Sequence, residues 1–407
     1  MYRLLFEIIS EVRIKPIIMN TMSLKSIYSP VWWVILISGI SFFVNNCNKE
    51  DKVDTQWEFV GDEGFSDTHA NSQKLAFSPS GDLYVAYVLT FSGIEVRKFD
   101  GKDWIYIGDP GFAPSSTELS FAISLDGVPY VAFHESTGTY PSYKMSVMKF
   151  DGTKWLYVGQ PNFSPAQAWH LSLAISPTGE PHVSFYDGSI TLPKASVMKY
   201  DGTQWIYVGD KYISSAEAVP SIDFSLQGDL YVVYTDFALN NKATVKKYEG
   251  TNWINVGNPG FSEGESWGVD IEISSSGQPY VAFNNLSDSD TIGISVMKFE
   301  ENVWKYVGAK RLSEGFHGQG GVLVINDAGE PFIAFQDIYT NESEKSKASV
   351  MKFNGTKWEY VGSRGFSPGG SDSYSLAMDP AGRPYLAFRE VSDVCYFQTT
   401  VMKYAIP

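Results

Sequence analysis

The segment SVMKFDGTKW, residues 146–155, decides the fold, because it returns almost unchanged as SVMKFNGTKW at residues 349–358. Both copies end in a tryptophan that opens the motif Trp-x-x-(Val/Ile)-Gly. The motif occurs seven times, at Trp57, Trp104, Trp155, Trp205, Trp253, Trp304 and Trp358. Neighbouring copies lie about 50 residues apart, a period typical of propellers and other repeat architectures.

Each repeat contains the signals of four short strands. A further motif precedes the VMKF segment, as in ISLDGVPYVAF (123–133) and ISSSGQPYVAF (273–283). The glycine of this motif marks a tight turn between two strands. The Asp-Gly pair after the segment VMKF is typical of a two-residue hairpin that leads into the tryptophan strand. No sustained 3.6-residue period indicates helices. The sequence therefore predicts an all-β fold with four antiparallel strands in each repeat.

The two ends of the repeat region complement each other. The first three strands of the repeat occur seven times, and the last set ends at residues 401–404 without a tryptophan strand. Residues 57–61 are a tryptophan strand with no partners before it. We predict that this N-terminal strand completes the last blade of a seven-bladed β-propeller over residues 57–407, which removes the open edges that a sheet otherwise exposes.

The repeat resembles that of bacterial seven-bladed β-propellers, with Kelch-like and Asp-box-like proteins as looser relatives. The resemblance covers residues 57–407 and implies the propeller fold, although Arg97 and Lys246 stand in two repeats where the other five have the methionine of VMKF. It leaves the function open, because propellers host hydrolases, lyases, lectins and scaffolds alike.

The N-terminal segment has the features of an export signal. Residues 31–44, VWWVILISGISFFV, are apolar and uncharged, and they are shorter than the roughly 20 residues of a membrane-spanning helix. The residues around Cys47, VNNCNKED, resemble the lipobox of bacterial lipoproteins and the export tag of Bacteroidetes-type surface lipoproteins, although Asn46 stands where that family has Gly, Ala or Ser. The alternative is a plain anchor or cleaved signal in which Cys47 has no role.

The lipoprotein resemblance implies a leader at 1–47, a linker at 48–56 and a lipid on Cys47. It places the protein in the bacterial cell envelope, at the outer membrane, held to the membrane through the lipid anchor alone. Glu7 and Glu11 are unusual in a signal, so the true start is expected at Met19 or Met22.

Charge and cysteine content exclude several classes of protein. The net charge is −15, from 46 acidic and 31 basic side chains, and such a surface repels nucleic acid. The two cysteines, Cys47 and Cys395, exclude a disulfide scaffold. We expect a monomer.

A series of polar residues follows the second strand of the repeats. Its members are Glu135, Asp187, Asp236, Asn285, Asp337 and Glu390. One hypothesis places them in a ring at the top of a central channel, where their oxygens could bind ligand or calcium. The other hypothesis is that each accepts hydrogen bonds within its own loop.

Long, variable loops follow the second and fourth strands, whereas the other turns are short and uniform. Alternate strand ends share a face, so one face of the propeller is predicted to be loop-rich and functional. Its candidate binding residues are Trp169, His170, Trp267, His317 and Tyr374. Trp169 and Trp267 occupy matching positions in two repeats, and paired indoles suit sugar rings; the alternative is that they fill space between the loops.

Catalytic motifs are absent from the sequence: it contains no HExxH, GxSxG or phosphate-binding loop. The leading hypothesis is a non-enzymatic propeller, anchored in the envelope, whose loop-rich face binds glycan or an envelope protein, with no cofactor other than calcium. The alternative is a secreted or surface polysaccharide hydrolase or lyase that uses a carboxylate pair on the same face. A third hypothesis is an assembly scaffold without a small ligand.

Overall fold

The computed structural model describes residues 56–405, except for 115, 136–142, 287–291, 313–320, 338–345 and 392–395. The chain divides into two units, Met1–Asn46 and Cys47–Pro407, and the described residues belong to the second. The leader and Cys47 therefore lie outside the described residues. Within the described part, no helix is long and apolar enough to span a membrane.

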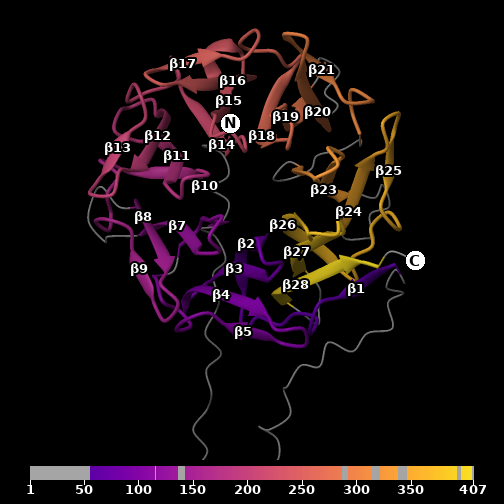
Figure 1. Ribbon diagram of the computed structural model, residues 1–407. Coiled ribbons are helices and arrows are strands. Elements are labelled where there is room, and N and C mark those ends of the chain that lie inside the picture. Colours follow the sequence, from indigo (N-terminus) through magenta and orange to yellow (C-terminus); the bar gives the residue numbers. More distant parts are fainter. Residues whose placement is uncertain are drawn as a thin grey trace, which may run out of the picture. The chain divides into compact units, whose positions relative to one another are not determined.

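The described residues form seven four-stranded antiparallel sheets, the blades of a β-propeller (Figure 1). Blade 1 contains β2 (Ala70–Phe77), β3 (Leu83–Leu89), β4 (Gly93–Phe99) and β5 (Trp104–Tyr106). Blade 2 contains β6 (Leu119–Ile123), β7 (Pro129–Glu135), β8 (Lys144–Phe150) and β9 (Trp155–Tyr157). Blade 3 contains β10 (Ala168–Ile175), β11 (Pro181–Asp187), β12 (Lys194–Tyr200) and β13 (Trp205–Tyr207). Blade 4 contains β14 (Ala218–Phe224), β15 (Leu230–Asp236), the 3-10 turn η1 (Phe237–Leu239), β16 (Lys242–Glu249) and β17 (Asn252–Asn255).

The remaining blades keep the same order of strands. Blade 5 contains β18 (Glu265–Ile273), β19 (Pro279–Leu286), β20 (Ile292–Glu300) and β21 (Val303–Tyr306). Blade 6 contains β22 (Val322–Ile325), β23 (Pro331–Asp337), β24 (Lys347–Phe353) and β25 (Trp358–Tyr360). Blade 7 contains β26 (Gly370–Met378), β27 (Pro384–Val391), β28 (Tyr396–Tyr404) and β1 (Trp57–Phe59). Figure 1 shows the first strand of each blade toward the centre of the ring and the fourth at its periphery.

Blade 7 joins the two ends of the propeller. β1 pairs antiparallel with β28, with Trp57 opposite Tyr404 and Phe59 opposite Met402. The pairing continues as Val60 N–H donates to the carbonyl of Val401 at 2.9 Å. The all-β, seven-bladed fold predicted from the repeat is thus confirmed, with β1 as the fourth strand of the last blade.

The repeated tryptophans link each blade to the next. Each of the seven repeated indoles donates from its Nε1 to the backbone carbonyl of the residue that follows the fourth strand of the preceding blade, at 2.7–2.8 Å. Trp104 bonds to Val60 across the junction of blades 7 and 1. The next residue, Gly61, has φ +76°, and a Cβ there would lie 2.9 Å from the Trp104 ring. This close approach explains why glycine is the last residue of the motif in all seven repeats.

Apolar packing lies mainly between blades. One cluster, for example, joins Val88 and Val96 of blade 1 to Leu119 and Phe133 of blade 2. Seven such clusters are found among the described residues. Each blade is therefore stabilised by both of its neighbours, and the ring as a whole depends on being closed.

Candidate functional site: an aromatic rim and an acidic channel wall

Strand register defines two faces of the propeller. In blade 3, Ala168 at the start of β10 lies opposite Asp187 at the end of β11, and Asp187 lies opposite Lys194 at the start of β12. The loops after the second and fourth strands therefore emerge at one end, which we call the loop face. The opposite end, the smooth face, carries tight turns such as Ser176–Gly179, closed by a 2.8 Å backbone hydrogen bond. This arrangement agrees with the prediction from loop lengths.

Trp169 belongs to an aromatic cluster on the loop face, which consists of His134, Tyr143 and Trp169. The half-buried Trp169 ring lies 5.1 Å from the His134 ring and 4.8 Å from the Tyr143 ring, between ring centroids. His134 is fully buried, and its ring nitrogens lie 3.2 Å from Thr117 Oγ1 and 3.4 Å from Ser116 Oγ. Burial lowers the pKa of His134, so its ring is neutral at pH 7 and acts as a fixed support for the indole.

Polar groups border the aromatic cluster. His170 N–H donates to Glu118 Oε2 at 2.6 Å, and His170 Nδ1 lies 3.7 Å from Glu118 Oε1. The exposed His170 ring approaches Tyr186, whose hydroxyl donates to Glu217. Burial raises the pKa of Tyr186, which keeps this hydroxyl a donor. The rim of blades 2 and 3 thus combines an indole with carboxylate and imidazole groups.

A β-bulge places Trp169 at the rim. The register of β10 shifts between Trp169 and Ser172, and the same shift occurs in β18 between Trp267 and Asp270. The bulge puts His170 at φ +54°, a left-handed conformation that redirects the side chains around it. Trp267 is 42% exposed and contacts Phe237 at 5.9 Å. Both indoles therefore lie on the loop face, and neither is fully buried between blades.

Tyr374 was predicted to be an exposed loop residue, and this prediction is wrong. Its side chain is 7% exposed, and its hydroxyl donates to the backbone carbonyl of Ser371 at 2.6 Å. The bulge between Asp372 and Ser375 turns Tyr374 into the apolar cluster between blades 6 and 7. His317, another candidate, lies outside the described residues.

The acidic series after the second strands does not lie at the centre of the ring, because the first strands are innermost and the series lies one strand further out (Figure 1). Each described carboxylate instead has partners within its own blade. Asp187 and Glu135 accept hydrogen bonds from the hydroxyls of Tyr207 and Tyr157. Asp337 accepts from the hydroxyl of Ser349 and the guanidinium of Arg364. Glu390 accepts from the hydroxyl of Thr400, and Asp236 from the backbone N–H of Ala238. Among the described residues, no cluster of three or more His, Cys, Asp or Glu could hold a metal ion. The calcium hypothesis therefore gains no support from these residues.

Sequence reasoning missed a group of acids on the innermost strands, which we call the channel-wall acids: Asp223 on β14, and Asp270 and Glu272 on β18. Asp270 Oδ2 accepts from Leu323 N–H at 3.1 Å, just as Ser172 Oγ accepts from Ile222 N–H at 3.2 Å in blades 3 and 4. An acid thus replaces the serine that joins neighbouring blades elsewhere. Asp223 makes a similar contact between blades: its Oδ2 accepts a hydrogen bond from Ile273 N–H at 2.8 Å. Comparing the first strands of the seven repeats position by position would have revealed this substitution.

The channel-wall acids are held in a poorly solvated environment. Burial, with a contribution from Asp270, raises the pKa of Asp223 to about 7, although two backbone N–H groups oppose the shift. Burial likewise raises the pKa of Asp270 to about 6 and raises that of the nearby Glu272. Burial lowers the pKa of Lys74, which faces Asp270 and Glu118. The channel wall therefore carries acids that are partly protonated near neutral pH.

These shifts predict a pH-dependent stability. The folded-state pKa of Asp223 lies above its unfolded value of about 3.9, so the stabilising contribution is complete below pH 4 and is lost as the pH rises toward 7. Asp223→Asn keeps an acceptor for the backbone but removes the charge. We expect it to stabilise the protein at pH 8, on the order of 1–2 kcal/mol, with a gain that shrinks toward pH 4. Urea unfolding at both pH values measures this, with the exposed Asp327→Asn as a control; an equal gain at both pH values would contradict the prediction.

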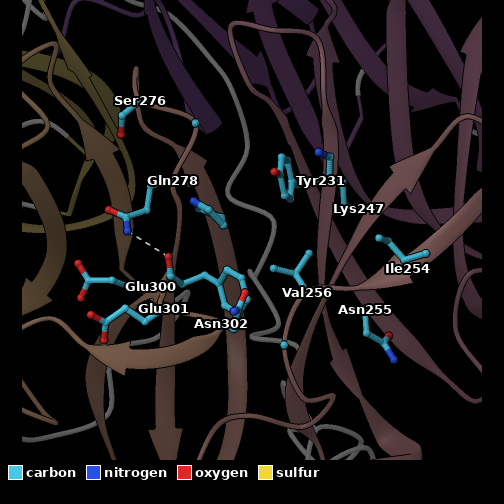
Figure 2. Close-up of a pocket in the computed structure, with 14 residues that line it drawn as sticks. Tyr231, Lys247, Ile254, Asn255, Val256, Ser276, Gln278, Glu300, Glu301 and Asn302 are labelled. Atoms are coloured by element: carbon cyan, nitrogen blue, oxygen red, sulfur yellow. Dashed lines mark hydrogen bonds between the residues drawn. The ribbon is translucent and has the colours of Figure 1, made fainter.

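One groove lies on the smooth face, away from the aromatic cluster. It has a volume of about 590 Å³ between blades 4 and 5, where Tyr231 and Lys247 face Gln278 and Glu300 (Figure 2). A smaller groove of about 250 Å³ between blades 6 and 7 is lined by Phe332 and Lys352 at the matching positions. Because the groove recurs between blades, we interpret it as a product of the repeat geometry.

Comparisons with solved structures show the fold. An oligogalacturonate lyase from Vibrio parahaemolyticus superposes with a TM-score of 0.56 at 9% identity, over 88% of this chain and 97% of that one. A polysaccharide lyase, an ulvan lyase, gives 0.53 at 11% identity, over 85% and 95% of the two chains. YCF48 from Cyanidioschyzon merolae gives 0.51 at 11% identity, over 86% and 98%. No family model matches the chain, and no curated protein matches its sequence.

Proposed function

We propose that the protein is a non-enzymatic, envelope-anchored propeller whose loop face binds glycan. The observation that carries this proposal is the aromatic cluster at the rim of blades 2 and 3. There the half-buried Trp169 is held by His134 and Tyr143, next to the polar pair of Glu118 and His170. An indole offers a flat apolar face to the C–H groups of a sugar ring, and the polar pair offers hydrogen bonds to its hydroxyls.

Two further features support a binding role. The cluster lies on a rigid scaffold of β-strands, so little ordering is needed when a ligand binds. Trp267 provides a second exposed indole on the same face, at the matching position two blades away. A glycan chain that reaches both indoles would gain affinity from the simultaneous contacts.

A glycan array with the purified chain from residue 52 onward identifies the ligand and tests the proposal. We expect Trp169→Ala to weaken binding about tenfold or more, a loss of about 1.4 kcal/mol, because the stacking surface is removed. The variant should stay folded, since Trp169 is not one of the seven repeat tryptophans. Leu192→Ala, which changes an exposed apolar residue on the same face, is the matched control and should bind normally.

The proposal fails if no glycan binds, or if Trp169→Ala and Leu192→Ala bind alike. In that case an envelope protein becomes the preferred partner of the loop face, and a pull-down with the same two variants tests it.

A polysaccharide hydrolase or lyase is the second candidate, and one observation favours it. Asp223 and Asp270 on the channel wall have raised pKa values, as a general acid near neutral pH requires. Incubation with the bound glycan and detection of new reducing ends or unsaturated products tests this. Turnover that Asp223→Asn abolishes would establish the enzyme; binding without turnover favours the non-enzymatic role.

We also propose that Cys47 carries the lipid that anchors the protein in the envelope. The apolar segment at 31–44 and the sequence VNNCNKED support this proposal. Substitution of Cys47 by serine tests it.

A further inference from the structure

We propose that the smooth face is the membrane-facing side of the propeller and rests on the bilayer, so that the loop face points away from it. This inference rests on the proposed lipid anchor at Cys47. The smooth face is then a second interaction surface, and a bilayer of zwitterionic lipid covers it.

The chain enters the propeller at the smooth face. β1 pairs with the end of β28, so Trp57 lies at the smooth-face end of blade 7. The carbonyl of the preceding Gln56 accepts from Ala405 N–H at 2.7 Å, which fixes the point of entry beside the last residues of β28. From there β1 runs toward the loop face. The described part of the chain therefore begins at the smooth face of the propeller.

The segment between Cys47 and Gln56 is short compared with the height of the propeller and its loops. Eight residues, 48–55, separate Cys47 from Gln56, and they can span at most about 30 Å at 3.3–3.6 Å per residue. The eight-residue strand β10 alone is about 26 Å long at 3.3 Å per residue, and the loops extend beyond it. To bring the loop face to the bilayer, the linker would have to run the full height of the propeller along its outside. The smooth face needs no such path.

The smooth face carries exposed apolar side chains. Leu125 and Leu226, in turns between first and second strands, are 63% and 64% exposed, and Ile254 in the outer strand β17 is 40% exposed. The loop face also exposes apolar residues, such as Phe91 and Leu192, so the entry point and length of the chain, rather than apolar area, favour the smooth face. Exposed leucines at the membrane interface contribute apolar area to lipid binding.

Several charges on the smooth face are paired. Lys98 lies 2.9 Å from Asp82, Lys247 lies 3.0 Å from Asp229, and Lys352 lies 2.7 Å from Glu330. The turns of this face also carry exposed acids, such as Asp126 and Asp151. Because such acids are repelled by anionic lipid, we expect the smooth face to rest on zwitterionic lipid.

Fluorescence quenching in vesicles tests the orientation with the full lipidated chain. In a Cys395→Ser background, Leu226→Cys and Phe91→Cys each receive a single environment-sensitive fluorophore, on the smooth face and at an exposed loop-face position respectively. The protein is reconstituted in phosphatidylcholine–phosphatidylethanolamine vesicles that contain a lipid-borne quencher. We expect several-fold stronger quenching of the label at position 226 than of the label at position 91.

A second variant tests the apolar contact itself. With the label placed at Pro79→Cys on the smooth face, Leu125→Asp together with Leu226→Asp should reduce quenching, whereas Leu192→Asp on the loop face should not. Mass spectrometry of the same samples reports the lipid on Cys47.

The outcomes separate the orientation from the anchor. If Cys47 carries lipid but the label at position 91 is quenched as strongly as that at 226, or neither is quenched, the orientation is wrong and the anchor stands. If light scattering shows paired copies that shield position 226 from the quencher, the occupant is a second copy and the inference fails. If Cys47 carries no lipid in cells, the anchor and the orientation fall together.

Discussion

Deleting residues 48–61 is expected to unfold or aggregate the propeller at temperatures where the intact protein is stable. The deletion removes β1, the fourth strand of blade 7, and leaves the edge of β28 open. It also removes Trp57, which is 1% exposed, stacks on Phe366 at 3.9 Å and donates to the carbonyl of Val361 at 2.8 Å. Loss of a core tryptophan alone costs about 3–5 kcal/mol. Val60, which receives the Trp104 hydrogen bond, is lost as well.

Thermal unfolding monitored by circular dichroism measures this effect. Deletion of residues 48–55 alone is the matched control, because it keeps β1, and its melting temperature should equal that of the intact chain. Trp57→Ala should fall between the two. An unchanged melting temperature after deletion of 48–61 would show that the ring does not depend on β1.

Cys47→Ser is expected to release the protein from membranes and to abolish lipid labelling, because the thiol is the proposed attachment point. Fractionation of cells and metabolic labelling with a fatty acid measure the two effects. Cys395→Ser, which removes the other cysteine of the chain, is the control and should leave both unchanged. Retention of Cys47→Ser in the membrane fraction would contradict the lipoprotein proposal.

The sequence predicts the blades well because each carries strong local markers. The seven tryptophans, the hairpin turns and the alternating apolar residues identify the strand positions, and their recurrence identifies the ring. Closure by β1 was predictable for the same reason, since the unmatched Trp57 strand and the incomplete last repeat need each other. The loop face followed from chain direction alone.

The distance of a residue from the centre of the ring was harder to predict than its position along a strand. The acids at Asp187 and Asp337 occur in register, but their place on the second strand puts them beside Tyr207 and Arg364 rather than in the channel. Tyr374 was misplaced because a bulge, which leaves no clear mark in one sequence, turns it inward. The channel-wall acids were missed because their strands read as ordinary repeats until Asp270 is compared with Ser172.

The closure of the ring also sets the order in which the protein can fold. Trp57 is among the first propeller residues to leave the ribosome, whereas its partner Tyr404 is among the last. Contacts between residues so far apart in sequence form slowly, because a long loop must close before they are made. Until then, the edge of β28 and the apolar surfaces of blades 6 and 7 remain available to other chains. The chain is therefore most vulnerable to aggregation in the interval between the synthesis of β28 and the docking of β1.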